Sequence, residues 1–174
     1  MHNNVVNNYS NHIAILGAGI SGLTFGCILK KANISSVIFE KSKDISDYGA
    51  GISISPNGIR ILKNLNLYDE VVDVSSNPKK ADFYSDNKKI NSFEIDVVTT
   101  SRQVLYKSLY EKYISMNGEI LFGHELYSTN FEKLELHFLN DKTYQVRHIA
   151  ACDGIKSICR KKVEYQMDPE YSGY

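Results

Sequence analysis

The sequence has no excess of charge of either sign and no long apolar run. Lys and Arg together number 20, as do Asp and Glu, so the formal net charge is zero. A nucleic-acid-binding protein usually has a basic excess, so this class of partner is not indicated. No apolar run approaches the roughly 20 residues that a membrane-spanning helix needs. Neither nucleic acid nor a membrane span is therefore expected.

Cysteines are also few, and their spacing is uninformative for metal binding. Cys27, Cys152 and Cys159 form neither a CxxC pair nor a zinc-ligand pattern. They are expected to be small buried apolar side chains in a reducing cytoplasm. The three histidines of the C-terminal third show no ligand spacing, and no nucleophile–base pair stands out. The sequence therefore predicts no metal ligand and no catalytic side chain.

The N-terminal segment, residues 1–11, is rich in Asn. It lacks the basic flank and the apolar stretch of a signal peptide. We expect it to be a disordered tail and the protein to be cytoplasmic.

The following residues predict a strand, a helix and a second strand. Residues 12–16 are a short apolar run that ends at Gly17, which is typical of a strand buried on both faces of a parallel sheet. Residues 20–32 have helical spacing, with two glycines one turn apart that would let the helix lie close to the sheet. Residues 36–39 form another apolar run. This order predicts a right-handed βαβ unit in an α/β fold.

The turn between the first strand and the helix reads Gly17-Ala18-Gly19-Ile20-Ser21-Gly22, a GxGxxG pattern. In such a turn the first glycine permits the tight bend, the second leaves room for a pyrophosphate, and the third lets the helix approach the strand. The N–H groups and dipole of the helix start favour an anion. Glu40, 18 positions after Gly22, stands where a carboxylate accepts hydrogen bonds from both ribose hydroxyls. The pattern predicts a dinucleotide site for FAD or NAD; a glycine-rich turn without a ligand is the alternative.

After Glu40 the chain departs from the regular alternation that a simple NAD dehydrogenase would keep. A loop or short strand is expected at residues 48–55. Ser55 as N-cap and Pro56 as first helical residue predict a helix that runs to about Leu65. Residues 79–96 read as a β-hairpin.

The second half of the chain predicts a further helix and more strands. Thr100 and Gln103 fit a capping box, and the helix that follows is expected to end near residues 117–118. We then expect a parallel strand, a hairpin that leads into another strand, and a short helix, at residues 119–122, 134–152 and 155–161.

Three stretches in this order carry a family resemblance. The first is the GxGxxG turn with Glu40 and Lys41. The second runs from Gly49-Ala50-Gly51-Ile52 into Pro56-Asn57-Gly58. The third is Arg102, followed by Ala151-Cys152-Asp153-Gly154 with Ser157 and Arg160. Together they resemble the flavoprotein aromatic hydroxylases, the FAD-dependent monooxygenases that include salicylate, hydroxybenzoate and ubiquinone-pathway hydroxylases. The resemblance covers roughly residues 12–174, and residues 171–174 are similar to the start of the family's substrate-domain sheet.

This resemblance implies FAD as the cofactor, NAD(P)H as co-substrate, and hydroxylation of a small aromatic or related ring by O2. It implies cofactor contacts at Gly17, Gly19, Ile20, Ser21, Gly22, Glu40, Lys41, Gly51, Arg102, Asp153 and Gly154. A cation in the first turn of a helix conflicts with the helix dipole, and an anion bound at Arg102 would remove the conflict. Asp153 and Gly154 follow a strand, at the usual ligand edge of an open α/β sheet. An exposed arginine and an ordinary Asp-Gly turn are the alternatives.

The expected architecture is α/β: a Rossmann-like FAD-binding domain with a parallel sheet, an added β-hairpin and the beginning of a substrate-binding sheet. We expect the FAD-binding domain at residues 12–77 and 98–163, and a partial substrate domain at residues 78–97 and 164–174. The family's later Gly-Asp motif has no counterpart, so the N-terminal portion of a hydroxylase is expected. A truncated non-catalytic nucleotide-binding remnant and a related flavoprotein reductase or cyclase are the alternatives. The substrate, the choice between NADH and NADPH, and the oligomeric state stay open.

Overall fold

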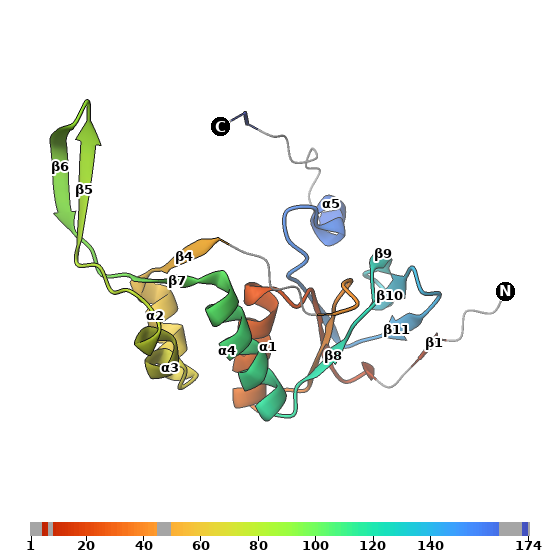
Figure 1. Ribbon diagram of the computed structural model, residues 1–174. Coiled ribbons are helices and arrows are strands. Elements are labelled where there is room, and N and C mark those ends of the chain that lie inside the picture. Colours follow the sequence, from red (N-terminus) through yellow and green to blue (C-terminus); the bar gives the residue numbers. More distant parts are fainter. Residues whose placement is uncertain (1–4, 7–8, 45–49, 164–171, 174) are drawn as a thin grey trace. The chain divides into compact units, whose positions relative to one another are not determined.

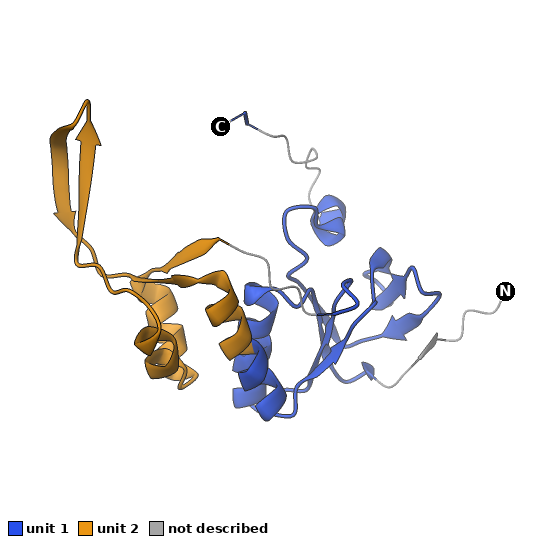
Figure 2. Ribbon diagram, viewed as in Figure 1, with its two compact units in different colours: residues 1–46, 110–174 blue, residues 47–109 orange. Residues whose placement is uncertain are grey.

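The computed structural model describes residues 5–6, 9–44, 50–163 and 172–173 (Figure 1). The chain falls into two compact units, one of residues 1–46 and 110–174 and one of residues 47–109 (Figure 2). These units divide the chain at other positions than the FAD-binding and substrate domains expected from the sequence, and that domain division stays a prediction. Within the described ranges, no helix combines the length and the apolar character that crossing a bilayer requires.

A four-stranded parallel sheet forms the centre of the first unit. Its strands are β2 (Ile13–Leu16), β3 (Ser36–Phe39), β8 (Glu119–Leu121) and β12 (His148–Ala151), in the order β12-β2-β3-β8. Strand β3 is buried along its whole length, as expected for a strand covered on both faces. The parallel strand predicted after residue 118 is confirmed as β8. Because all four strands run the same way, the carboxyl ends of β2, β3 and β12 lie at one edge of the sheet.

Helix α1 (Ile20–Lys31) connects β2 to β3 and completes the predicted βαβ unit. Leu23 and Cys27 are fully buried on its sheet-facing side. Gly26 allows close packing, because a Cβ atom there would lie 2.8 Å from the ring of Tyr113. Two lysines in the last turn complement the negative end of the helix dipole.

A second, mainly antiparallel sheet packs on the parallel sheet. Its order is β1-β11-β10-β9, with β1 at Val5–Val6, β9 at Leu126–Asn130, β10 at Glu135–Phe138 and β11 at Thr143–Gln145. The hairpin expected from the sequence is confirmed as β10–β11, with Leu136 opposite Tyr144. The core between the sheets joins Val37 and Phe39 of β3 to Phe138 and Tyr144, and the rings of Phe39 and Phe138 stack with centroids 4.8 Å apart.

The prediction that residues 1–11 form a disordered tail is wrong for part of this segment. Strand β1 pairs with β11 in parallel. The hydroxyl of Tyr9 donates to the Glu119 carboxylate at 2.7 Å, and its ring lies 6.0 Å from that of Phe39. The Asn-rich composition predicts disorder, whereas the ring of Tyr9 packs against the aromatic core. Residues 1–4 and 7–8 lie outside the described residues.

The second unit contains two strand pairs and helices. Its elements are β4 (Gly51–Ile54), α2 (Pro56–Asn64), α3 (Tyr68–Asp73), β5 (Lys80–Ser85), β6 (Lys88–Glu94), β7 (Val98–Ser101) and the first part of α4 (Arg102–Ser115). The predicted hairpin is confirmed as β5–β6, and Asp86 and Asn87 both take the positive φ of a two-residue hairpin turn. Helix α2 also begins and ends where expected. Strand β4 pairs with β7, which the sequence did not predict. Of the loop predicted at residues 48–55, residues 48–49 lie outside the described residues.

The capping box predicted at Thr100 and Gln103 is wrong. Strand β7 continues through Ser101, and Thr100 lies in it opposite Ile52. The helix therefore begins one residue later, and the Ser101 hydroxyl accepts a hydrogen bond from the Val104 N–H at 3.1 Å. The other end agrees with the sequence: Asn117 takes a left-handed φ of 57°, and the Gly118 N–H donates to the Tyr113 carbonyl.

This corrected cap gives a paired prediction. Ser101→Ala should lower the free energy of unfolding by about 1 kcal/mol, because the Val104 N–H loses its acceptor. Thr100→Val should leave stability within about 0.5 kcal/mol of wild type or raise it, because the buried Thr100 hydroxyl has no partner in the described part of the chain. Urea denaturation of both variants measures the difference. A larger loss for Thr100→Val would show that Thr100 is the cap after all.

Candidate dinucleotide-binding site

The turn from β2 into α1 contains three glycines that are needed for different reasons. Gly17 has φ +102°, and a Cβ atom there would lie 2.6 Å from the Cys152 carbonyl oxygen. At Gly22 a Cβ atom would lie 1.9 Å from the Gly17 carbonyl oxygen. A Cβ atom added at Gly19 would have no heavy atom of the described residues within 4 Å, if the two neighbouring residues in the chain are left out. The packing of the described residues thus requires Gly17 and Gly22 and places nothing in the space beside Gly19.

The start of α1 presents backbone donors beside this space. Gly19 is the N-cap and supplies no side-chain cap, and the first turn contains no acidic residue. The first helical hydrogen bond runs from the Leu23 N–H to the Gly19 carbonyl. The N–H groups of Ile20 and Ser21 therefore lie at the positive end of a 12-residue helix. Such an end binds phosphate groups well.

Glu40 lies at the end of β3, directly beside the glycine turn. One carboxylate oxygen accepts a hydrogen bond from the Ala18 N–H at 2.6 Å, and the other accepts from the Ser42 N–H at 2.8 Å. Each oxygen has a further lone pair that can accept a hydroxyl proton. Lys41, the next residue, is exposed. Both donors are backbone N–H groups, so residue type does not reveal them. The Ser42 contact is local, only two residues from Glu40, as short polar loops often make.

Asp153 and Gly154 follow β12 at the same edge of the sheet. One Asp153 carboxylate oxygen accepts from the Ile158 N–H at 2.9 Å. The other is buried and has no hydrogen-bond partner among the described residues. A buried acceptor without a partner is costly, so a donor from a bound ligand would stabilise this arrangement. Gly154 takes φ +78°, which turns the chain away from the strand.

Helix α5 (Ile158–Val163) begins three residues later than predicted. The reason lies in its cap: the Ser157 hydroxyl accepts from the Arg160 N–H at 3.0 Å. The residues predicted as its first turn instead form the bend after Gly154. The Arg160 guanidinium donates to the Ile155 carbonyl at 2.6 Å and so fixes this bend.

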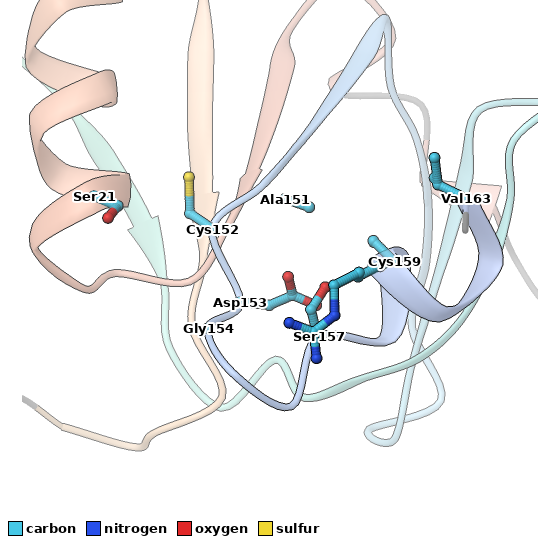
Figure 3. Close-up of a pocket in the computed structure, with 9 residues that line it drawn as sticks. Ser21, Ala151, Cys152, Asp153, Gly154, Ser157, Cys159 and Val163 are labelled. Carbon is cyan, nitrogen blue, oxygen red and sulfur yellow. The ribbon is translucent and has the colours of Figure 1, made fainter. Parts of the chain in front are cut away.

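A pocket of about 540 Å³ joins the start of α1 to the Asp153–Gly154 bend (Figure 3). It is lined by Ser21, Ala151, Cys152, Asp153, Gly154, Ser157, Cys159, Arg160 and Val163. Burial raises the pKa of the Cys159 thiol to about 11, and burial also raises the pKa of Cys152. Both thiols are therefore protonated near neutral pH and act here as small apolar groups.

The remaining predicted site residues lie in the second unit. Gly51 begins β4 opposite Ser101, and the Arg102 N–H donates to the Ala50 carbonyl at 3.2 Å. Arg102 is exposed in the first turn of α4. The structure thus brings Gly51 and Arg102 together in one unit, and the glycine turn, Glu40 and the Asp153–Gly154 bend together in the other. Gly49 lies outside the described residues.

A parallel sheet with this glycine turn after one strand and an acidic residue after the next defines the dinucleotide-binding class of α/β proteins. The backbone at Gly19, which no described residue covers, and the carboxylate held beside it fit the pyrophosphate and ribose of such a ligand. The Asp153 oxygen that has no partner among the described residues can accept from a further donor group. Residues 10–173 match the family described as FAD binding domain, and the chain belongs to this family. The predicted cofactor, FAD, is confirmed at the level of the family.

Similar proteins support the family and its fold. The chain is 26% identical over 175 residues to 2,6-dihydroxypyridine 3-monooxygenase of Paenarthrobacter nicotinovorans, covering 95% of this chain and 42% of that protein. It is 31% identical over 153 residues to Monooxygenase 1 of Arabidopsis thaliana, covering 84% and 38%. The tetrameric form of 2-methyl-3-hydroxypyridine-5-carboxylic acid oxygenase has a TM-score of 0.81 at 23% identity, covering 88% of this chain and 42% of that one.

The matches confirm the predicted α/β fold class and the predicted resemblance to FAD-dependent monooxygenases. The chain spans about two fifths of the length of these curated relatives.

Proposed function

We propose that this chain holds the adenosine and pyrophosphate of FAD in a flavoprotein monooxygenase that uses NAD(P)H and O2 to hydroxylate a small aromatic or related ring. The observation that carries the proposal is the open backbone at Gly19, with the Glu40 carboxylate fixed beside it through the Ala18 N–H. The names of relatives support the reaction class, among them 3-amino-4-hydroxybenzoate 2-monooxygenase of Streptomyces cremeus, which is 25% identical over 174 residues. The activity is proposed for the whole protein.

The proposal assigns a binding role to each group. The pyrophosphate would lie against Gly19 and the N–H groups of Ile20 and Ser21, where the helix dipole favours negative charge. Glu40 would accept hydrogen bonds from the ribose hydroxyls with the lone pairs that Ala18 and Ser42 leave free. The carboxylate is already in place, so binding does not have to order it.

Further contacts complete the proposed site. The unpartnered oxygen of Asp153 would accept from a donor group of the ligand, and Gly154 would let the ligand approach the backbone. Gly51, Arg102 and Lys41 are proposed as additional cofactor contacts; an anion bound near Arg102 would offset its unfavourable place in the first turn of α4. The bound isoalloxazine would supply the redox chemistry with NAD(P)H and O2, while the chain's own residues bind and orient the cofactor.

Calorimetric titration with ADP tests the site directly, because ADP carries the groups that this chain is proposed to bind. Glu40→Gln should raise the Kd for ADP by about tenfold to a hundredfold, because the amide loses negative charge and turns a donor toward one of two fixed N–H groups. Glu132→Gln, an exposed change in the same unit, is the matched control and should leave the Kd unchanged. Equal affinities for wild type and Glu40→Gln would contradict the proposed ribose contact.

The reaction class needs a separate measurement. Flavin absorbance in the purified protein, with NADH or NADPH oxidation and O2 consumption stimulated by an aromatic acid, would support a monooxygenase. A colourless protein that binds ADP and oxidises neither nucleotide would instead support a nucleotide-binding module without turnover.

A further inference from the structure

The segment that carries Glu40 is held by a turn that the cofactor does not touch in the proposed site. This turn, residues 121–124, begins at the last residue of β8. The Glu40 N–H donates to the Leu121 carbonyl at 2.9 Å, and the Glu40 carbonyl accepts from the His124 N–H at 2.8 Å. Two residues after Glu40, the Ser42 carbonyl accepts from the Gly123 N–H of the same turn at 2.9 Å. The backbone on both sides of the carboxylate is therefore fixed by the 121–124 turn.

The imidazole of His124 fixes this turn in its shape. The ring is 7% exposed and lies against the rings of Phe39 and Phe138, with centroids 5.7 and 5.2 Å away. Its Nδ1 lies 2.8 Å from the Phe122 carbonyl oxygen, and its Nε2 lies 3.0 Å from the Tyr144 hydroxyl. A carbonyl only accepts, so Nδ1 carries the proton, and Nε2 of the neutral ring accepts from Tyr144. Both ends of the ring are thus engaged, one within the turn and one in β11.

We propose that the neutral imidazole of His124 positions Glu40 for the ribose of the cofactor, and that protonating this imidazole releases Glu40 and weakens nucleotide binding. The proposal rests on the proposed function of Glu40. His124 acts through the 121–124 turn and touches neither cofactor nor substrate, so it is a positioning residue. Its ring links the aromatic core between the two sheets to the carboxylate at the sheet edge.

Protonation would break this arrangement for two reasons. The imidazolium has no acceptor nitrogen, so the Tyr144 hydroxyl could no longer donate to it. The new charge would also be buried. Burial lowers the pKa of His124 below its ordinary value, the Phe122 carbonyl opposes this effect, and the nearby Lys142 cation adds to it. Among the described residues, the Tyr144 hydroxyl faces the ring, and Glu119 and Tyr9 interact electrostatically with Tyr144.

The direction of the pH dependence follows from this lowered pKa. The unfolded or released state takes up the proton at a higher pH than the native state does, so acid favours release. The contribution of His124 to positioning Glu40 is complete above the ordinary histidine pKa of about 6.5. It is lost as the pH falls through the lower pKa that His124 has in the folded protein.

Amide hydrogen exchange of the full chain without ligand tests the positioning by itself. His124→Phe keeps an aromatic ring but loses both hydrogen bonds, and it should speed exchange of the Ala18 and Ser42 amides by about tenfold or more. His124→Asn should speed exchange less than His124→Phe does, since its amide can still donate to the Phe122 carbonyl but no longer meets the Tyr144 hydroxyl. His137→Phe is the matched control, because His137 lies in β10 and bonds Thr143 instead, and it should leave both amides unchanged.

Calorimetric titration with ADP between pH 5 and 8 tests the consequence for binding. Protonation of the terminal phosphate of ADP at about pH 6 affects both proteins alike. From pH 7.5 to pH 5 the Kd of wild type should therefore rise about threefold to tenfold more than that of His124→Asn. Unchanged exchange and unchanged ADP affinity in His124→Phe, or the same pH profile in wild type and His124→Asn, would overturn the proposal. If His124→Phe does not fold, Tyr144→Phe removes only the hydroxyl and should speed the same two amides to a smaller extent; no acceleration there would overturn it.

The two proposals can fail separately. Wild-type protein that binds no ADP at pH 7.5 would overturn the proposed nucleotide function. Faster exchange at Ala18 and Ser42 in His124→Phe would still support the role of His124 in holding Glu40.

Discussion

Replacing Gly19 by Val should reduce the affinity for ADP and FAD by about a hundredfold or more while the protein stays folded. The N-cap backbone at Gly19, with φ −71° and ψ 179°, is extended and open to any residue. A side chain there would meet no heavy atom of the described chain beyond its immediate neighbours. It would instead fill the space proposed for the pyrophosphate. Titration calorimetry with ADP, together with urea denaturation, measures both effects.

A graded series strengthens this test. Gly19→Ala should give an intermediate loss of affinity, because its single methyl group fills less of the space beside the helix start. The free energy of unfolding should fall by only about 1 kcal/mol in either variant, the cost of replacing glycine by the poorer N-caps alanine and valine. Wild-type affinity in a folded Gly19→Val protein would mean that the pyrophosphate lies elsewhere.

The sequence predicted the βαβ unit well because its determinants are local. Strands β2 and β3 are buried on both faces and therefore read as continuous apolar runs. The glycine turn between β2 and α1 has its own pattern, and Glu40 follows β3 directly. The same holds for the β5–β6 hairpin, whose turn residues Asp86 and Asn87 tolerate a positive φ.

Elements that depend on distant contacts were missed or misplaced. The error at Thr100 arose because β7 extends through its pairing with β4, which brings together residues about 50 positions apart. Tyr9 is ordered by Glu119, 110 residues away. Helix α3 has Leu67 at its N-cap position and no side-chain cap, so it lacks the usual start pattern. Neither the two long-range contacts nor the start of α3 has a local sequence pattern from which it could be predicted.

The candidate site shows the same division. The glycines and Glu40 could be named from their motif, because a diphosphate and a ribose require those residue types. Asp153 could be named from the family resemblance and from its place after a strand. The donors that hold Glu40, at Ala18 and Ser42, are backbone groups and could not be identified from residue type. The proposed role of His124 could not be predicted either, because its spacing in the sequence does not reveal that its backbone N–H bonds to the Glu40 carbonyl.

Gly22→Ala should have the largest effect on stability within the glycine turn. The new Cβ atom would lie 1.9 Å from the Gly17 carbonyl oxygen and 3.3 Å from a methyl carbon of Ile15. The first of these is a backbone atom and cannot move aside by changing rotamer, so α1 would have to shift away from β2. Overpacking of this kind should lower the free energy of unfolding by about 3 kcal/mol or more. Urea denaturation followed by far-UV circular dichroism measures this loss.

The sign of this effect separates tertiary packing from helix propensity. Alanine is the better helix former by about 1 kcal/mol, so propensity alone predicts that Gly22→Ala stabilises the protein. Ser21→Ala, at the exposed neighbouring position, is the matched control and should change stability by less than about 0.5 kcal/mol. Wild-type stability in Gly22→Ala would show that α1 lies further from β2 than described. A large loss of stability in Gly22→Ala and a small one in Gly19→Val would show that the two glycines have different roles. The fold requires Gly22, and the ligand requires Gly19.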